Sequence, residues 1–379
     1  MNSSHRFMND PADKPRIASP SHEMLASLAR IRASNPPVHT CSTGWSFSGL
    51  YAGPTSVAYL FYRLSQIYDV DTEFEHQKLL EWAEEYLTLG VRQQKRDPTP
   101  KHCGIGDETL SHVALSAVVA DDTGLAQKLC AYATAINSPT DDGSNEWLYG
   151  RAGYLYLLRL CRTAFSQSSH HATLALLDRT IEATVERILK VAQPWVWHGK
   201  EYLGAAHGTI GIICQVVLST PAAAPKLQQT LSDLLDRQYQ SGNFPSSLPT
   251  GPDRLVQFCH GSPGFVLSLR SLLPHFPDLQ RKMQDAITAA QSDIWKRGLL
   301  TKEPCLCHGI AGNALALDDP EQFAHMLAFM GSEALEHYFD HSVRNSEGAS
   351  LYTGEAGRAW VWAVADQSLS RGCIGYNDL

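Results

Sequence analysis

A short glycine motif that recurs along most of the chain constrains its fold more than any other feature. The pattern Gly-x-x-Gly recurs at regular intervals in five copies between residues 150 and 357, and two earlier copies keep only the first glycine. The seven first glycines are Gly53, Gly106, Gly150, Gly208, Gly261, Gly309 and Gly354, which are 53, 44, 58, 53, 48 and 45 residues apart. A repeat of roughly 50 residues is typical of architectures in which one supersecondary unit packs against the next. The spacing therefore predicts seven helical hairpins, each with one outer and one inner helix.

Each glycine pair leads into an apolar stretch with helical periodicity. Clear examples are residues 154–160, 210–218, 265–272 and 359–365. The first glycine of each pair is expected to permit a tight turn or a close backbone approach at the entrance to the helix. Because the alternating apolar pattern of strands is nearly absent, the sequence predicts an all-α fold.

Seven hairpins can form an open solenoid or a closed ring, and periodicity alone fits both. The chemically distinctive residues all lie in the glycine loops, as a site at one end of a ring requires. We therefore expect an α/α toroid (double α-barrel) of seven helical hairpins with Gly-x-x-Gly loops. Length alone would allow two domains. The continuous repeat instead predicts an N-terminal segment and first helix over residues 1–40 and a single barrel domain over 41–379.

Composition narrows the compartment and the partners. Hydrophobic residues make up 44% of the chain and charged residues 18%, which fits an ordered core, and the net charge of −8 disfavours nucleic acid as a partner. No apolar run reaches the ~18 residues that a transmembrane segment needs, and the N-terminus lacks a signal-peptide core, so a cytoplasmic protein is expected. Nine scattered cysteines then indicate reduced thiols and a metal site, not a disulfide framework.

Two Cys-His-Gly phrases stand in the fifth and sixth repeats, within Phe-Cys-His-Gly-Ser-Pro-Gly and Leu-Cys-His-Gly-Ile-Ala-Gly. Thiolates and imidazoles are the ligands that zinc prefers. Cys259, Cys307 and His308 would supply three ligands and leave a fourth position for water or a substrate thiol, as in catalytic zinc sites. Cys305, two residues before Cys307, is an alternative ligand.

Together these motifs resemble the lanthionine synthetase C-like family, and its eukaryotic branch more than its bacterial one. The resemblance runs from Arg6 to the C-terminus. Its specific pieces are Trp-His-Gly-Lys-Glu-Tyr-Leu-Gly-Ala-Ala-His-Gly at 197–208, Leu-Tyr-Gly-Arg-Ala-Gly-Tyr at 148–154, and the two Cys-His-Gly phrases with Asn313. Bacterial cyclases usually carry Cys-Tyr-Gly in the fifth repeat, so Cys-His-Gly there indicates the eukaryotic branch.

The resemblance implies a fold, a metal and an activity. Family members form a double α-barrel of seven inner and seven outer helices, with one Zn²⁺ at one end held by residues that match Cys259, Cys307 and His308. The zinc lowers the pKa of a bound thiol, and the thiolate adds to dehydroalanine or dehydrobutyrine to form a thioether. Bacterial cyclases use a cysteine of the same peptide. Eukaryotic relatives use glutathione as co-substrate and dehydroamino-acid-containing peptides or proteins as partners.

Michael addition also needs an acid that protonates the α-carbon. His207 opens a repeat phrase like those of the ligands and matches the family's active-site histidine, so it is the candidate acid. His260 is read as a cavity residue that helps to protonate or orient the substrate, because a fourth protein ligand would leave no place for a thiol. Glu146 stands where bacterial cyclases use an aspartate; it either pairs with His207 or is an exposed loop acid.

Glutathione carries two carboxylates, so a glutathione enzyme should supply cations near its zinc. Lys302 falls where the eukaryotic relatives have a glutathione-contacting lysine. Arg6 lies in a segment similar to their N-terminal Arg-aromatic-x-Asn, and Arg344 stands about where a third such cation occurs. For each of the three, a solvated surface charge is the alternative.

Other functions fit parts of the pattern. Glycosidases built on α/α barrels need two placed carboxylates, but the loops offer Asp107, Glu146 and Glu355 without a matched pair, and protein prenyltransferases lack this glycine repeat. A non-catalytic zinc- and glutathione-binding sensor or scaffold protein stays open, because a metal site stabilises a fold with or without turnover. A thiol-conjugating or cyclising enzyme of a natural-product pathway also stays open.

Overall fold

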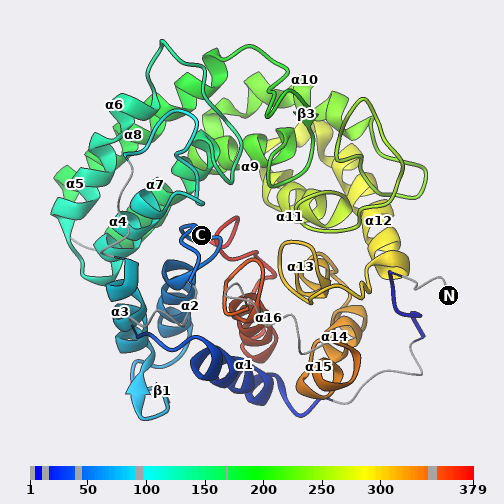
Figure 1. Ribbon diagram of the computed structural model, residues 1–379. Helices are drawn as coiled ribbons and strands as arrows, with labels where there is room; N and C mark the ends of the chain where they lie inside the picture. The colour runs from blue at the N-terminus through cyan, green and yellow to red at the C-terminus, as the bar shows by residue number, and fades with distance from the viewer. Residues whose placement is uncertain (1–4, 11–16, 39–44, 91–96, 168–169, 340–347) are drawn as a thin grey trace.

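The fold is a ring of helices, as the glycine repeat and the distinctive residues in its loops together predict. A computed structural model describes residues 5–10, 17–38, 45–90, 97–167, 170–339 and 348–379. Within these ranges an inner helix begins after each of the seven glycine motifs (Figure 1). The inner helices are α2 (Pro54–Ile67), α4 (Glu108–Val119), α7 (Arg151–Phe165), α9 (Thr209–Ser219), α11 (Ser262–Leu272), α13 (Ile310–Leu315) and α16 (Glu355–Asp366).

An outer layer of helices covers the inner ring. It comprises α1 (Pro20–Ser34), α3 (Leu79–Gly90), α5 (Thr123–Ala131), α8 (His171–Lys190), α10 (Ala224–Leu235), α12 (Gln280–Arg297) and α14 (Pro320–Ala328), followed by α15 (Ser332–Tyr338). Helices α3, α5, α8, α10, α12 and α14 each pack on the inner helix that precedes them, whereas α1 packs on the last inner helix, α16. Amphipathic helices of this kind bury one face against the inner ring and leave the other to solvent.

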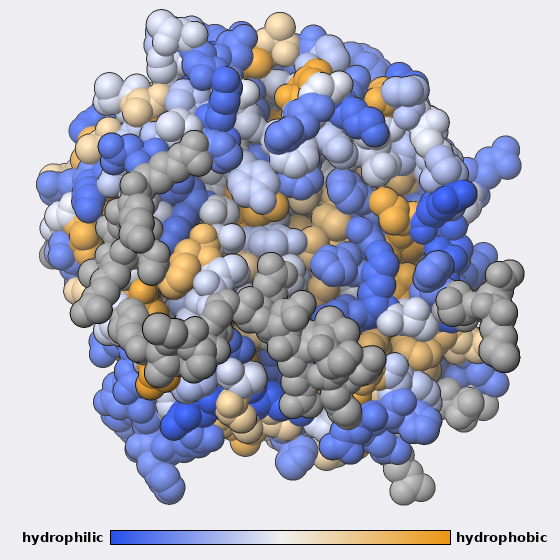
Figure 2. Space-filling model, in the orientation of Figure 1, coloured by the Kyte–Doolittle hydropathy of each residue, from blue (hydrophilic) through white to orange (hydrophobic). Residues whose placement is uncertain are grey.

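The ring is closed. Each inner helix contacts the next, from α2 through α4, α7, α9, α11 and α13 to α16, and α16 contacts α2 again. The α/α toroid is therefore confirmed and the open solenoid is excluded. Figure 2 shows one end of the ring, with blue hydrophilic side chains over much of the periphery and paler or orange ones toward its middle.

The second glycine of each Gly-x-x-Gly pair is required by a close backbone contact. A Cβ atom at this position would lie 2.0–2.3 Å from the carbonyl oxygen six residues earlier in the chain. The five pairs are Gly153 with Trp147, Gly211 with Ala205, Gly264 with Phe258, Gly312 with Leu306, and Gly357 with Leu351. Because no side chain fits there, the loop can fold back onto the first turn of its own inner helix.

The first glycines cap these helices, and the second repeat departs from the pattern. Gly53 and Gly261 have positive φ angles of 100° and 116°, which favour glycine. In the second repeat the cap is Asp107 and not Gly106, and its carboxylate accepts a hydrogen bond from Leu110 N at 2.8 Å. An acidic N-cap therefore replaces the capping glycine in that loop, and the helix begins one residue later.

Backbone hydrogen bonds join successive glycine loops around the ring. They run from Leu50 N to Ile105 O (2.9 Å), Gly106 N to Leu148 O (2.8 Å), Trp147 N to Ala206 O (3.2 Å), Cys259 N to Cys307 O (3.1 Å), Cys307 N to Tyr352 O (2.9 Å) and Tyr352 N to Tyr51 O (3.1 Å). Between the fourth and fifth loops, the carbonyl oxygen of Cys259 lies 2.4 Å from where a Cβ of Gly204 would be. These contacts bring the loops together at one end of the ring.

The C-terminal segment fills the axis of the barrel beneath the loops (Figure 1). Buried Tyr376 packs against Trp147 and Phe258, with ring centroids 5.4 and 5.2 Å apart. Asp378 forms an ion pair with Arg63 of α2 and accepts a hydrogen bond from Tyr156 of α7 at 2.8 Å. The inner ring is therefore a packed core, which the chain's own last residues help to fill.

Regular structure outside the two helical layers is short. The described strands form two antiparallel pairs, β1 (Glu73–Phe74) with β2 (Gln77–Lys78) and β3 (Glu201–Tyr202) with β4 (Ser247–Leu248). The remaining helical turns are α6 (Ala133–Ile136), η2 (Pro221–Ala223), η3 (Leu273–His275) and η4 (Pro277–Leu279). None of the helices in the described ranges has the length and apolar character needed to cross a bilayer.

We predict that Gly153→Ala destabilises the fold. The new methyl group would lie 2.0 Å from Trp147 O and 2.5 Å from Ile105 N, so backbone would have to move. We expect a loss of about 1–3 kcal/mol in the free energy of unfolding, measured by urea denaturation. Gly251→Ala is the control, because nothing lies within 4 Å of its Cβ position. Equal stabilities of the two variants would contradict the prediction.

The buried carboxyl of Glu108, where the first two repeats meet, predicts that the stability of the fold depends on pH. Glu108 accepts hydrogen bonds from Thr55 Oγ1 (2.5 Å) and Gly49 N (2.9 Å), and burial raises the pKa of its carboxyl from 4.5 to about 7. Between pH 4.5 and 7 the folded state therefore holds a proton that the unfolded state has lost, so this group's contribution to stability falls as the pH rises.

Replacing Glu108 with glutamine should remove this dependence, because the amide does not titrate and can still bond both partners. The stability of Glu108→Gln relative to wild type should rise by up to about 3 kcal/mol between pH 5 and pH 8. Urea unfolding at the two pH values measures the difference. A constant difference would show that Glu108 titrates near its ordinary pKa.

Candidate functional site

The loops that precede the inner helices carry the predicted site residues to one end of the ring. His207 directly precedes the cap of α9, and Cys259 and Cys307 stand two residues before the caps of α11 and α13. Each position is fixed by the glycine contact of its own repeat and by the hydrogen bonds between loops. The structure brings Cys259 next to Cys307, and His207 next to Glu146.

Cys259 and Cys307 lie side by side. Both are buried, with 7% and 6% of their surface exposed, and their side chains are within hydrogen-bond distance of each other. The hydrogen bond from Cys307 lowers the pKa of the Cys259 thiol, and the same pairing, together with burial, raises the pKa of Cys307. The pair can therefore hold one negative charge more readily than two, unless a cation joins it.

Each sulfur also accepts a hydrogen bond from another side chain. Tyr51 Oη lies 3.1 Å from Cys307 Sγ, and Gln257 Nε2 lies 3.0 Å from Cys259 Sγ. Sequence reasoning missed both donors. The signal for Tyr51 was its place two residues before Gly53, which is the repeat position of both cysteines.

Two soft sulfurs in contact suit a thiophilic metal such as zinc. In the described residues no three His, Cys, Asp or Glu side chains are grouped so that they could hold a metal ion. His308 follows Cys307, and burial lowers the pKa of its imidazole, which favours the neutral form that binds metals. Burial raises the pKa of the alternative ligand Cys305 to about 12. The third ligand stays a prediction.

Glu146 pairs with His207. Its carboxylate is 1% exposed and lies 2.9 Å from His207 Nδ1. The same carboxylate accepts hydrogen bonds from the backbone N–H groups of Leu148, at 2.8 Å, and Tyr149. The sequence left two interpretations of Glu146 open. The interpretation as a partner of His207 is therefore correct, and the interpretation as an exposed loop acid is wrong. An imidazole whose Nδ1 faces a carboxylate keeps its Nε2 free to exchange a proton.

Aromatic rings surround this pair. The imidazole of His207 stacks on Trp197, with ring centroids 3.9 Å apart and planes 4° from parallel. His260 lies 6.1 Å from the His207 ring and 5.7 Å from that of Tyr202. Burial and the neighbouring His207 lower the pKa of His260 to about 4. Its buried Nδ1 has no hydrogen-bond partner among the described residues, so His260 is a neutral group with an unused polar atom.

A cavity lies behind the His207–Glu146 pair. It has a volume of about 200 Å³ and is lined by both members of the pair together with Ser144, Trp195 and Trp197. His207 therefore borders this cavity and also neighbours the ring of His260.

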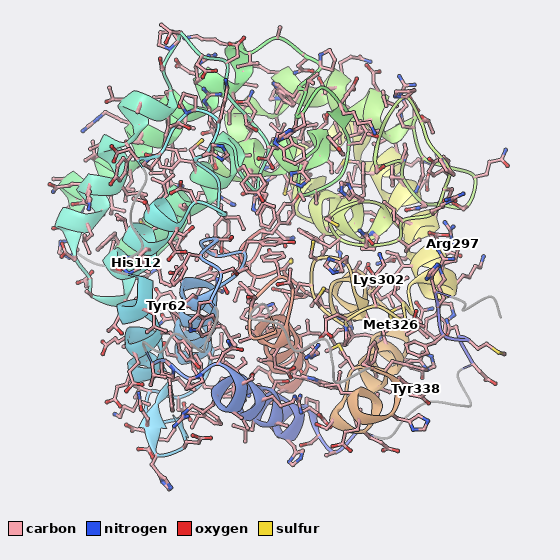
Figure 3. The ribbon with its side chains drawn as sticks, in the orientation of Figure 1. Tyr62, His112, Arg297, Lys302, Met326 and Tyr338 are labelled. Atoms are coloured by element: carbon pink, nitrogen blue, oxygen red, sulfur yellow. The ribbon has the colours of Figure 1, made fainter. Side chains whose placement is uncertain are left out.

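The three predicted cations differ in their surroundings. Lys302 lies on the same face as the loops, near α13 (Figure 3), and its ammonium donates to Gln257 Oε1 at 3.0 Å. Arg6 donates to the carbonyl oxygens of Arg297 and Arg254, both at 3.0 Å. Arg344 lies outside the described residues.

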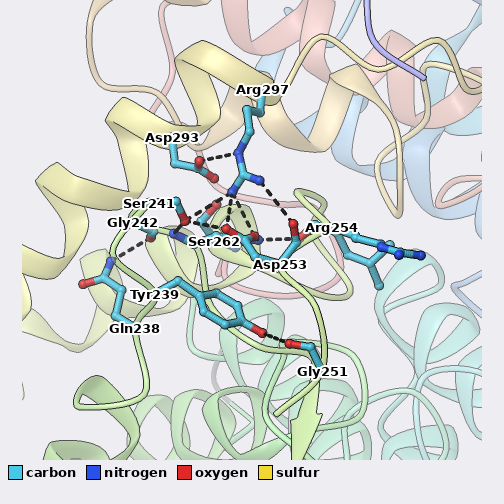
Figure 4. Close-up of polar contacts among 12 residues, drawn as sticks. Gln238, Tyr239, Ser241, Gly242, Gly251, Asp253, Arg254, Ser262, Asp293 and Arg297 are labelled. Carbon is cyan, nitrogen blue, oxygen red and sulfur yellow. Dashed lines mark hydrogen bonds and ion pairs between the residues drawn. The ribbon is translucent and has the colours of Figure 1, made fainter. Parts of the chain in front are cut away.

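Arg297 and Asp253 are at the centre of a polar network (Figure 4), and the carbonyl oxygen of Arg297 accepts the hydrogen bond from Arg6. Arg297 forms ion pairs with Asp253 and Asp293, at 2.9 and 2.6 Å. Asp253 accepts from Asn243 at 2.7 Å, and the amide oxygen of Asn243 accepts from the first backbone N–H of α11. This network ties the N-terminal segment and α12 to the loop that carries Cys259.

Comparisons with known proteins identify relatives of this chain by sequence and by fold. A profile of the lanthionine synthetase C-like protein family matches residues 44–357. The chain is 26% identical over 378 residues to the glutathione S-transferase LANCL1 of Danio rerio, covering 92% of this chain and 87% of that protein. It is 28% identical over 244 residues to the LanC-like protein GCL1 of Arabidopsis thaliana, covering 58% and 54%.

Among solved structures, nisin cyclase has a similar fold. The TM-score is 0.62, and the match covers 93% of this chain and 94% of that one. At 14% sequence identity, this likeness shows the fold alone.

We predict that Glu146 is needed for stability as well as for the orientation of His207. Glu146→Ala would leave three buried donors without their acceptor, so a loss of about 3 kcal/mol in the free energy of unfolding is expected. Asp142→Ala is the control, because Asp142 forms only an exposed ion pair with Arg187 and should cost at most about 1 kcal/mol. Equal losses in the two variants, measured by urea denaturation, would contradict a buried role for Glu146.

Proposed function

The chain belongs to the lanthionine synthetase C-like family, and we propose that it adds a thiol, most directly glutathione, to dehydroalanine or dehydrobutyrine residues and so forms a thioether. The observation that carries the proposal is the paired thiols of Cys259 and Cys307 at the ring end that also holds the His207–Glu146 pair. The relative named a glutathione S-transferase supports glutathione as the thiol.

We propose Cys259, Cys307 and His308 as the ligands of a zinc ion. When bound, zinc supplies a Lewis acid that lowers the pKa of a substrate thiol. The two buried sulfurs provide the soft part of the ligand set, and the neutral imidazole of His308 provides the nitrogen.

His207 and Glu146 are proposed to handle the proton. As the substrate sulfur bonds to the β-carbon, the electrons of the C=C bond move to the α-carbon, which then takes up a proton. His207 can deliver this proton from Nε2, because Glu146 holds Nδ1 and stabilises the charged imidazole. The proton lost by the thiol balances the one gained by the α-carbon.

His260 and the two described cations are proposed to hold the substrates. The unpartnered Nδ1 of His260 can bond a polar group of the peptide or the developing enolate oxygen. Lys302 donates to a neutral amide and not to a carboxylate in its bond to Gln257, so its charge can attract a carboxylate of glutathione. Arg6 forms an antiparallel β-bridge with Leu300, two residues before Lys302. Arg344 is proposed from its position in the sequence alone.

The test combines metal content with thiol transfer. Wild-type protein should contain stoichiometric zinc and, with glutathione and a dehydroalanine peptide, give an adduct that mass spectrometry detects. Cys307→Ala should lose both zinc and adduct, whereas His207→Asn should keep zinc and slow adduct formation by about 10²–10⁴-fold. Cys130→Ala is the thiol control, since Cys130 lies in the outer helix α5.

Two results would overturn the proposal. Wild-type protein without zinc would refute the metal site, and adduct formation by Cys307→Ala at the wild-type rate would refute the role of the thiol pair. Zinc and glutathione binding without an adduct would instead indicate the sensor or scaffold function.

A further inference from the structure

The two buried sulfurs each have their own hydrogen-bond donor, and the donors come from different loops. Tyr51, in the first glycine loop, donates to Cys307 of the sixth loop at 3.1 Å. Gln257, in the fifth loop, donates to Cys259 at 3.0 Å. Hydrogen bonds to a charged sulfur are strong in a buried site, because little water competes with them.

Tyr51 is held in place by its neighbours. Its ring stacks on Tyr352, with centroids 5.3 Å apart and planes 7° from parallel. Its carbonyl oxygen accepts a hydrogen bond from Tyr352 N at 3.1 Å. Since Tyr352 belongs to the last repeat, the hydroxyl of Tyr51 reaches Cys307 only because the ring closes.

Gln257 is oriented by Lys302. The ammonium of Lys302 can only donate, so the atom that it contacts at 3.0 Å is the amide oxygen of Gln257. The amide nitrogen must then face Cys259 Sγ. The positive charge of Lys302 polarises the amide and strengthens the N–H···S bond, so a cation acts on the sulfur through a neutral side chain.

We propose that Tyr51 and the Lys302–Gln257 pair are positioning residues that orient the two sulfurs and share their negative charge when a metal ion is bound. The proposal rests on the proposed zinc site and deepens it by naming the groups that surround the ligands. Groups that bond to metal ligands typically change metal affinity by about 10–100-fold when they are removed.

The test uses metal ions alone as probes. Tyr51→Phe removes only the hydroxyl and keeps the ring stack, and Gln257→Leu removes the amide donor. Each variant should bind Zn²⁺ about 10-fold or more weakly than wild type in competition with a chelating dye. With Co²⁺ in place of Zn²⁺, the sulfur-to-metal charge-transfer band should move to longer wavelength, because a sulfur without its hydrogen bond gives up electron density more easily.

Lys302 supplies a second, independent check. If it acts through Gln257, Lys302→Met should weaken Zn²⁺ binding in wild type but change little in Gln257→Leu. Additive losses in the double variant would contradict the relay from Lys302. Tyr68→Phe is the matched control, because the Tyr68 hydroxyl bonds Asp366 at 2.8 Å and touches neither sulfur; its zinc affinity and cobalt spectrum should equal those of wild type.

The outcomes separate this inference from the proposed function. Wild-type affinity and an unchanged cobalt spectrum in folded Tyr51→Phe and Gln257→Leu, with binding lost in Cys307→Ala, would overturn the inference and leave the zinc site intact. No metal binding by wild type would overturn both.

Discussion

In five of the seven repeats, a close contact between the second glycine and the carbonyl oxygen six residues earlier is the constraint on which the candidate site depends. It lets the loop lie flat on the first turn of its own inner helix. Loops held this close exchange backbone hydrogen bonds with their neighbours, as Cys307 does with both Cys259 and Tyr352. The helix layers supply the buried area, but this contact sets where each loop side chain stands.

The repeat also explains why the site contains the residues that it does. Residues two positions before the capping glycine meet near the axis, and they include Cys259, Cys307 and Tyr51. Residues one position before the glycine include His207, His260 and His308. Similar loops thus carry sulfurs at one repeat position and imidazoles at the next.

The interior of the barrel is a packed core, whereas its loop end carries the candidate site. Beneath the loops, Trp147, Phe258 and Tyr376 pack into a closed aromatic core, and Asp378 pairs with Arg63 in the same interior. This filling keeps the axis from being a channel. The His207–Glu146 pair lies next to that core, because Glu146 and Trp147 are adjacent in the chain.

The sequence by itself determined the seven hairpins, the helix starts and the identity of the candidate cysteines and histidines. All of these follow from local patterns, namely helical periodicity and glycines that a backbone contact requires. Ring closure was expected from the residues in the glycine loops, but the repeat by itself also fits an open solenoid, so the tertiary structure decided it. The sequence did not determine the burial of Glu146 or the donors Tyr51 and Gln257. Tyr51 and Cys307 are 256 residues apart, and no local pattern links them. Their contact arises only because the last repeat packs on the first, and that packing is a property of the whole chain.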